Sequence, residues 1–309
     1  MSISELALLA KLNFVLDNIV IQAQNRLMNR LPLAKRVQIV SALVEGSSLR
    51  ATSRMANVSI NTVTKLLLDL APVCAEYQDR TLRNLTCKRI QCDEIWQFVY
   101  AKKKNVTSKI REKNPAAGDV WTWTAMDADT KLVLSVLVGG RDAAYAYEFM
   151  QDVASRLKHR VQLTTDGHKP YLSAVEDAFG ADVDYATLTK LYGGDVNDEK
   201  RYSPAVCIGC LSKAVTGDPD PKHISTSYVE RQNLTMRMSM RRFTRLTNAF
   251  SKKIENHAHS VALHYMHYNF VRIHKTLRVS PAMAAGVTDR LWSIGDIVRL
   301  VEQAEAQPK

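Results

Sequence analysis

Three carboxylates stand in settings where they could hold a metal ion. Asp93 lies in a strand-like run, Asp166 follows a short apolar segment, and Glu230 lies near the start of a basic segment. Carboxylates within a few ångström of one another repel, which raises their pKa values unless a cation is bound between them. Mg²⁺ prefers oxygen ligands, so a few carboxylates can hold it against substrate phosphates. Two such ions about 4 Å apart can activate a nucleophile and stabilise a leaving oxygen. We therefore expect the three acids to hold metal ions that catalyse phosphoryl transfer.

Each acid taken alone is more simply a surface carboxylate. Glu94, next to Asp93, or Asp127 could also replace Asp93 in this role. The hypothesis therefore depends on the three acids together with the basic segment that contains Glu230.

That basic segment, residues 224–250, could bind a polyanion. From residue 222 to residue 278 there are eleven Lys or Arg residues and two acids, Glu230 and Glu255. If residues 229–240 are helical, Arg237 lies about 10 Å along the axis from Glu230 and near the same face. The alternative is a solvated basic helix. The side chains that we expect to contact DNA here are Arg231, Asn233, Arg237, Arg241, Arg242 and Arg245.

Residues 32–84 have the pattern of three short helices that form a helix-turn-helix. Ser48 can cap the second helix and Ser59 the third, over residues 60–70. Asn57 stands where the turn needs a positive φ, which Asn tolerates. A helical bundle that does not bind DNA is the alternative. The leading residues of the third helix are of types that reach base edges and phosphates: Ile60, Asn61, Thr62 and Lys65.

The remaining chain predicts an α/β fold with a mixed sheet. In such a sheet the first and fourth strands can be neighbours, which would bring Asp93 and Asp166 together. Residues 195–221 are polar and rich in Gly, Asp and Pro, so we expect a loop or a small insertion there. Strands are predicted at 87–100, 119–127, 131–138, 161–165 and 183–187, and helices at 4–31, 143–157, 169–179, 229–240, 251–273 and from 281 onward.

Composition supports a globular protein with an acidic partner. The 309 residues are 46 % hydrophobic, with a formal net charge of +11 and a pI near 9.4, and nucleic acid is the commonest partner of such a chain. No apolar run is long enough to span a bilayer, and Glu5, Lys11 and Asp17 argue against a secretory signal. We therefore expect a cytoplasmic protein with no membrane partner.

The five cysteines are scattered, as in a reduced protein without a disulfide framework. Cys207 and Cys210 form a single C-x-x-C pair. A structural zinc needs four ligands, and His168 and His223 are the conceivable others. We expect the two cysteines to be unbound loop residues.

Three motifs resemble those of a known family. Cys92-Asp93-Glu94-x-Trp96, Thr165-Asp166-Gly167-x-x-x-Tyr171 and Tyr228-Val229-Glu230-Arg231-x-Asn233 resemble the acidic motifs of DDE transposases, and the pattern is nearest that of bacterial insertion-sequence transposases of the IS-one type. The resemblance covers residues 89–287. It extends to Arg241-Arg242-x-Thr244-Arg245-x-Thr247 and Tyr268-Asn269-x-x-Arg272-x-His274-x-x-Leu277.

The resemblance implies a ribonuclease-H-like catalytic core that cuts and joins the DNA ends of an insertion sequence. It implies two Mg²⁺ or Mn²⁺ ions per site, with Asp93, Asp166 and Glu230 as ligands. The partners would be double-stranded DNA, as terminal inverted repeats and target DNA, and a second copy in a homodimer or larger synaptic complex. The location would be the bacterial cytoplasm, in association with the nucleoid.

The resulting domain prediction has four parts. They are an amphipathic helix at 1–31, a helix-turn-helix domain at 32–84, a ribonuclease-H-like domain at 85–287 with an insertion near 195–221, and a helical tail at 288–309. Two features depart from the family: no cysteine precedes Cys74, where relatives carry a zinc-binding element, and the Asp166–Glu230 spacing is long. Two other functions stay open, a non-catalytic DNA-binding regulator and a metal-dependent nuclease that does not join strands.

Overall fold

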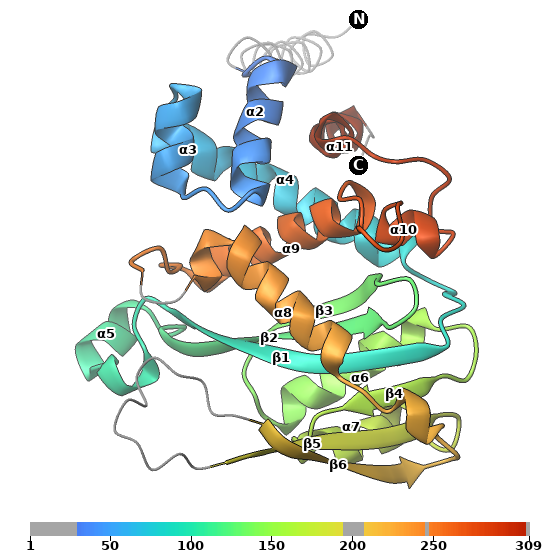
Figure 1. The fold of residues 1–309 in the computed structure, drawn as a ribbon. Coiled ribbons are helices and arrows are strands. Elements are labelled where there is room, and N and C mark those ends of the chain that lie inside the picture. Colours follow the sequence, from blue (N-terminus) through green and yellow to red (C-terminus); the bar gives the residue numbers. More distant parts are fainter. Residues whose placement is uncertain (1–29, 194–206, 245–246, 307–309) are drawn as a thin grey trace, which may run out of the picture.

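The computed structural model describes residues 30–193, 207–244 and 247–306 (Figure 1). Most of the predicted N-terminal helix at residues 4–31, as well as Arg245, lies outside the described residues.

The chain begins with three helices: α2 (Leu33–Val44), α3 (Leu49–Ala56) and α4 (Ile60–Thr81). The Ser48 side chain accepts from the backbone N–H of Ala51, and the Ser59 side chain accepts from that of Thr62. Asn57 between α3 and α4 has a φ of 49° and a ψ of 52°, in the left-handed region. The predicted caps of the second and third helices and the positive φ at Asn57 are therefore present.

The third helix is longer than predicted. It was expected to end at Leu70, but α4 continues to Thr81 and contains Pro72. A proline removes one intrahelical hydrogen bond and normally disfavours a helix interior. Here Pro72 is exposed, whereas Ala71 and Cys74 are fully buried, so core packing on both sides of the proline stabilises the continued helix.

A six-stranded mixed sheet forms the centre of the molecule, in the order β3-β2-β1-β4-β5-β6. β1 pairs antiparallel with β2 and parallel with β4, which confirms that the first and fourth strands are neighbours. The expected α/β class with a mixed, ribonuclease-H-like sheet is confirmed. The strands are β1 (Arg89–Val99), β2 (Gly118–Asp127), β3 (Val133–Gly139), β4 (Gln162–Thr165), β5 (Asp184–Tyr192) and β6 (Cys207–Thr216).

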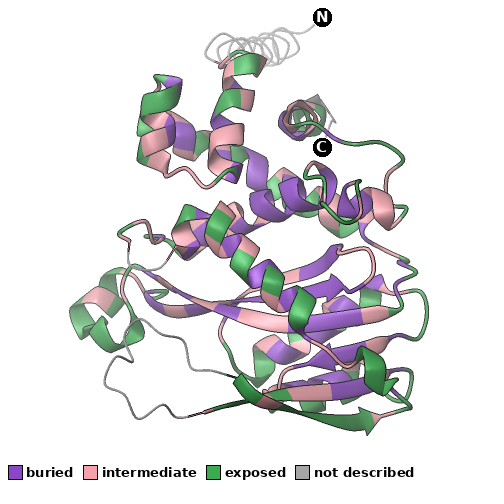
Figure 2. Cartoon of the chain, viewed as in Figure 1, coloured by how far each residue is buried: buried purple, intermediate pink, exposed green. Residues whose placement is uncertain are grey.

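β6 corrects the prediction of a loop at residues 195–221. Residues Cys207–Thr216 pair antiparallel with β5 and extend the sheet by one edge strand. The strand is exposed along almost its whole length (Figure 2). Because it buries no apolar face, its sequence lacks the alternation by which a half-buried strand is recognised.

Helices cover both faces of the sheet (Figure 1). α6 (Ala143–Arg156) and α7 (Pro170–Phe179) pack on one face, and α8 (Ser227–Ser239) and α9 (Ile254–Phe270) on the other. Alternation along β1 divides its side chains between the faces: Cys92 packs with the Trp123–Phe149 core, and Ile95 with Met236 and Tyr265. The same alternation points the adjacent Asp93 and Glu94 to opposite sides of β1.

Short elements complete the described chain. η1 (Lys103–Asn105) and α5 (Ser108–Lys113) lie between β1 and β2, and η2 (Pro221–His223) precedes α8. η3 (Arg241–Phe243) follows α8, and α10 (Pro281–Ala284) and α11 (Ile294–Ala306) end the fold. Among the described residues no single helix has the length and hydropathy to cross a bilayer, although α3 and α4 meet that criterion together, across a 110° bend.

Candidate functional site

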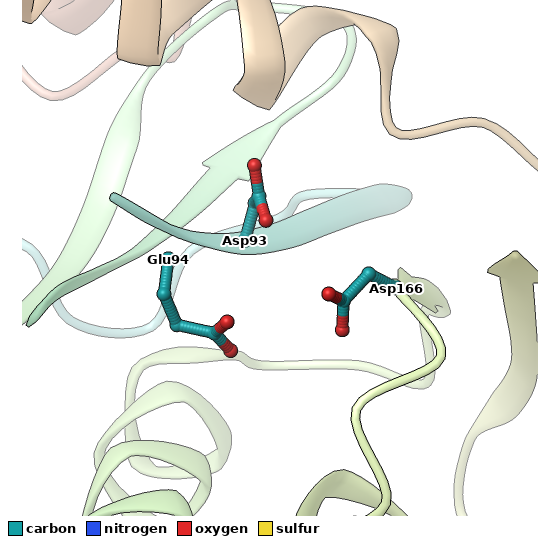
Figure 3. Close-up of side chains that lie close together, drawn as sticks. All are labelled: Asp93, Glu94 and Asp166. Carbon is teal, nitrogen blue, oxygen red and sulfur yellow. The ribbon is translucent and has the colours of Figure 1, made fainter. Parts of the chain in front are cut away.

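Asp93, Glu94 and Asp166 meet where β1 and β4 lie side by side (Figure 3). Asp93 and Glu94 are consecutive in β1, and Asp166 directly follows β4. One carboxylate oxygen from each residue lies within 4.8 Å of those of the other two. Figure 3 shows Glu94 and Asp166 reaching toward one another below β1, with Asp93 above them. The predicted approach of Asp93 and Asp166 is thus present, and Glu94 joins them.

Burial and mutual repulsion disfavour the charged forms of these acids. Burial, and next the charges of Glu94 and Asp166, raise the pKa of Asp93 to about 7. Burial, and next the charge of Asp166, raise the pKa of Glu94 to about 7. The Glu94 side chain is only 1 % exposed, and its Oε1 accepts no hydrogen bond of good geometry. A divalent cation would relieve both the repulsion and the unpaired oxygen, and oxygen ligands of this kind suit Mg²⁺ or Mn²⁺.

Glu230 lies on α8, which β1 holds in place. The Gln91 side-chain oxygen accepts from the backbone N–H groups of Tyr228 and Val229, at 2.9 and 3.2 Å. These bonds fix the first turn of α8 over β1, and the charge of Glu230 contributes to the raised pKa of Asp93. The Glu230 carboxylate accepts from Thr226 Oγ1 at 2.7 Å and forms an ion pair with Lys190 of β5. The third predicted acid therefore lies close enough to influence Asp93 but outside the group of three close carboxylates, and it has its own cation.

Asn233 is bound to Asp93. Its Nδ2 donates to Asp93 Oδ2 at 2.7 Å, and the residue is buried. We predicted a DNA contact for Asn233 from its place in the basic segment. In the structure it orients a carboxylate instead, because one helical turn separates it from Glu230 and places it on the face of α8 that packs on β1.

Arg141 is a site residue that the sequence did not reveal. It follows β3, and its guanidinium contacts Glu94 Oε2 at 3.1 Å and Asp166 Oδ2 at 3.4 Å. Lys190 was likewise missed. Both are ordinary surface residue types, far in sequence from the acids that they contact. The local sequence marks only the tight turn that carries Arg141, through Gly139-Gly140. A Cβ at either glycine would lie within 3.0 Å of the Tyr145 ring, so this turn needs glycine.

Asp127 is excluded as a substitute for Asp93. Its carboxylate accepts from the backbone N–H groups of Asp129 and Thr130 and from Thr130 Oγ1, in the turn between β2 and β3. It is 1 % exposed and fully engaged there. Its role is to close a hairpin.

The recognition-helix residues lie at the start of α4. Ile60, Asn61 and Lys65 are exposed, as a DNA-reading surface requires. Thr62 is half-buried, and its hydroxyl lies 2.9 Å from that of Ser59, so it contributes to the cap. Asn61 and Lys65 are thus the side chains of this group that are free to extend from the helix.

The basic segment divides into exposed and engaged arginines. Arg231 and Arg241 are exposed, and Arg237 is half-buried. Arg242 is half-buried, donates from Nη1 to Ser251 Oγ at 2.7 Å, and has a pKa lowered to about 10 by burial. This interaction takes Arg242 into the fold, whereas Arg231 and Arg241 stay exposed to solvent.

Cys207 and Cys210 lie on β6 rather than in a loop, and both are exposed. Among the described residues, the one group of three or more acidic, His or Cys side chains with metal-binding spacing is Asp93, Glu94 and Asp166. Of the two conceivable histidine ligands, His223 contacts Arg89 and His168 lies beside Tyr171, and neither forms such a group with the cysteines.

No family model and no curated protein sequence matches the chain. Among solved structures, it is similar to a Mos1 transposase paired-end complex with the left transposon end, at 15 % identity and a TM-score of 0.23, over 51 % of this chain and 60 % of that chain. It is also similar to a piggyBac transposase synaptic complex with hairpin DNA, at 10 % identity and a TM-score of 0.36, over 90 % of this chain and 73 % of that chain. The chain thus spans about 60 % of the Mos1 chain's length.

Proposed function

We propose that the protein is a DNA transposase of the DDE type, of the bacterial insertion-sequence kind that its motifs resemble. It would bind the terminal inverted repeats of its element, cut strands there and join the freed ends to target DNA. The observation that carries the proposal is the meeting of Asp93, Glu94 and Asp166 beside a basic helix that presents Glu230. A protein that only binds DNA has no need of buried, mutually repelling carboxylates.

The acids would act as metal ligands. Asp93, Asp166 and Glu230 would hold the divalent cations, and Glu94 is a further ligand that the geometry offers. Such ions, Mg²⁺ or Mn²⁺, supply activation of the attacking oxygen and stabilisation of the leaving oxygen. Asn233 would hold Asp93 in its productive orientation through the 2.7 Å hydrogen bond.

DNA binding would involve two surfaces. Asn61 and Lys65 on α4 would read the terminal repeat, and Arg231, Arg237 and Arg241 on or after α8 would hold phosphates near the acids. Joining two element ends requires two active sites in one assembly. We therefore propose a homodimer or a larger synaptic complex, acting on the bacterial nucleoid.

The test is a reaction with DNA from either side of the coding sequence. Purified protein is incubated with labelled duplexes of these candidate ends, an unrelated target duplex and Mg²⁺. Strand cleavage followed by covalent transfer to the target supports the proposal. Binding without cleavage identifies a regulator, and cleavage without transfer identifies a nuclease. A parallel reaction in excess EDTA must give no product.

A further inference from the structure

The segment between β1 and β2 is strongly basic and is not explained by the acid site. Residues 102–113, here called the basic arm, contain η1 and α5 and have six cations and one acid, Glu112. All six are exposed, and no ion pair of the described residues includes any of them. The six cations are Lys102, Lys103, Lys104, Lys109, Arg111 and Lys113.

The arm is fixed to the rest of the fold. The Asp119 carboxylate accepts from the backbone N–H of Lys103 at 2.9 Å, and Thr107 caps α5. After the arm, Asn114 Nδ2 donates to the carbonyl of Lys252 at 2.9 Å. That bond places two more exposed cations, Lys252 and Lys253, beside the arm. Because the backbone is anchored at these points, little ordering entropy has to be lost when the arm binds a ligand.

The arm and the acids lie toward the carboxyl ends of the parallel strands β1 and β4. β4 ends at Thr165, next to Asp166, whereas the parallel strand β1 continues from Asp93 to Val99 before the arm begins. Six residues of strand span about 20 Å. That length matches about 6 base pairs of duplex at 3.4 Å per step. Figure 1 shows α5 at this far end of β1, with the end of α8 nearby.

We propose that the basic arm, residues 102–113, binds the phosphate backbone of duplex DNA about 6 base pairs from the strand position held at the acids. The inference rests on the proposed function for the identity of the DNA. Six exposed cations that form no ion pair with the described residues fit a polyanion, and phosphate contacts fix register without reading sequence. An acidic protein segment is the competing ligand, and the test distinguishes the two.

The experiment compares two triple variants of the full chain. The arm variant carries Lys104→Gln, Lys109→Gln and Arg111→Gln, which remove exposed side chains that hold no other element in place. The matched control removes the same amount of charge at the opposite end of β1 and β4. It replaces three exposed lysines, one before β1, one before β4 and one in η2: Lys88→Gln, Lys158→Gln and Lys222→Gln. Circular dichroism and melting temperature check that both variants fold.

Affinity for a 30-base-pair mixed-sequence duplex is measured in EDTA from low to high salt, so that neither metal nor cleavage is involved. Each lost phosphate contact flattens the slope of log affinity against log salt by about 0.9, so the arm variant should lose up to about 2.7. The control should keep the wild-type slope. Equal slopes for the arm variant and wild type overturn the inference and leave an acidic protein as the ligand.

Equal flattening in both triple variants would also overturn the inference, because it would show a general charge effect. These outcomes are independent of the proposed function. DNA binding through the arm without any cleavage would support this inference and contradict the proposed function. Cleavage with an unchanged salt slope in the arm variant would support the proposed function and contradict this inference.

Discussion

At the scale of single residues, the acid site has its own counter-cations. Arg141 contacts both Glu94 and Asp166, and Lys190 pairs with Glu230. These cations stand against the oxygens that a divalent ion would need. A metal held through Glu94 Oε2 or Asp166 Oδ2 would compete with the Arg141 guanidinium for those oxygens. Asp93, Asp166 and Glu230 could be predicted from residue type and motif. Their cations could not, because only the folded sheet brings them together.

Arg141→Gln should therefore strengthen divalent metal binding. Without the Arg141 charge, the repulsion between Glu94 and Asp166 raises the free energy of the metal-free protein. Metal binding, which relieves this repulsion, becomes more favourable. We expect the dissociation constant for Mn²⁺, measured by calorimetry without DNA, to fall several-fold. Arg83→Gln, which removes an arginine from a remote ion pair with Asp79, is the control and should change nothing. A weaker or unchanged Mn²⁺ affinity in Arg141→Gln would show that the arginine merely supports the fold.

At the scale of elements, local rules predicted what local interactions determine. The caps by Ser48 and Ser59 and the left-handed Asn57 are each set by a few neighbouring residues, and all are present. The length of α4 and the existence of β6 depend on distant partners. Core packing of Ala71 and Cys74 stabilises α4 on both sides of Pro72. Hydrogen bonding to β5 stabilises β6 as a strand, although its sequence lacks the alternation of a half-buried strand. Neither partner can be read from the local sequence.

The start of α4 gives a prediction about DNA reading. Asn61→Ala should reduce discrimination between terminal-repeat and scrambled duplexes, with about 1–3 kcal/mol lost at the base that it reads. Lys65→Ala should weaken binding to both duplexes alike, since a phosphate contact carries no sequence information. Competition binding with the two duplexes separates these effects. If both variants bind both duplexes as the wild type does, the helices form a bundle that does not read DNA.

Helix α9 gives a prediction about pH. His264 is buried with neither ring nitrogen hydrogen-bonded, and burial, with a smaller effect of His267 and Arg272, lowers its pKa to about 3. In the unfolded chain the His264 ring takes up a proton as pH falls below about 6.5, whereas in the folded chain it stays neutral down to about pH 3. The free energy of unfolding is therefore unaffected by this ring above about pH 6.5 and decreases as pH falls from about 6.5 toward 3. At pH 5 the loss is about 2 kcal/mol.

His264→Leu should remove that loss. A leucine of similar size needs no hydrogen bond, so the variant should match or exceed wild-type stability at pH 8 and exceed it by about 2 kcal/mol at pH 5. Urea unfolding at the two pH values measures the difference. His159→Leu, at an exposed histidine, serves as the control and should show no such change. A wild-type pH dependence in His264→Leu would mean that the ring at this position is not held neutral.

At the scale of the whole molecule, helices α2 and α4 share one core with the sheet. Tyr77 of α4 packs against Phe270 of α9 at 5.5 Å and Trp292 at 5.0 Å between ring centroids. Arg36 of α2 forms an ion pair with Glu302 of α11 at 2.5 Å. The predicted boundaries at residues 84 and 287 therefore do not coincide with breaks in packing. Helix α4 is therefore held at a set position relative to the acids. With α4 reading the terminal repeat as proposed, the cut would fall at a fixed distance from that sequence.

The proposed function requires that the acids of this site perform strand cleavage, and their substitution tests this. Asp93→Ala, Asp166→Ala and Glu230→Ala are compared with wild type for cleavage of terminal-repeat DNA in Mg²⁺ and for binding of the same DNA. The control is Asp182→Ala, whose side chain is 80 % exposed and lies before the start of β5. Loss of outer-shell partners alone costs about 10–100-fold, so losing a ligand should cost at least about 100-fold in cleavage with binding retained. Wild-type cleavage by Asp166→Ala would contradict the account.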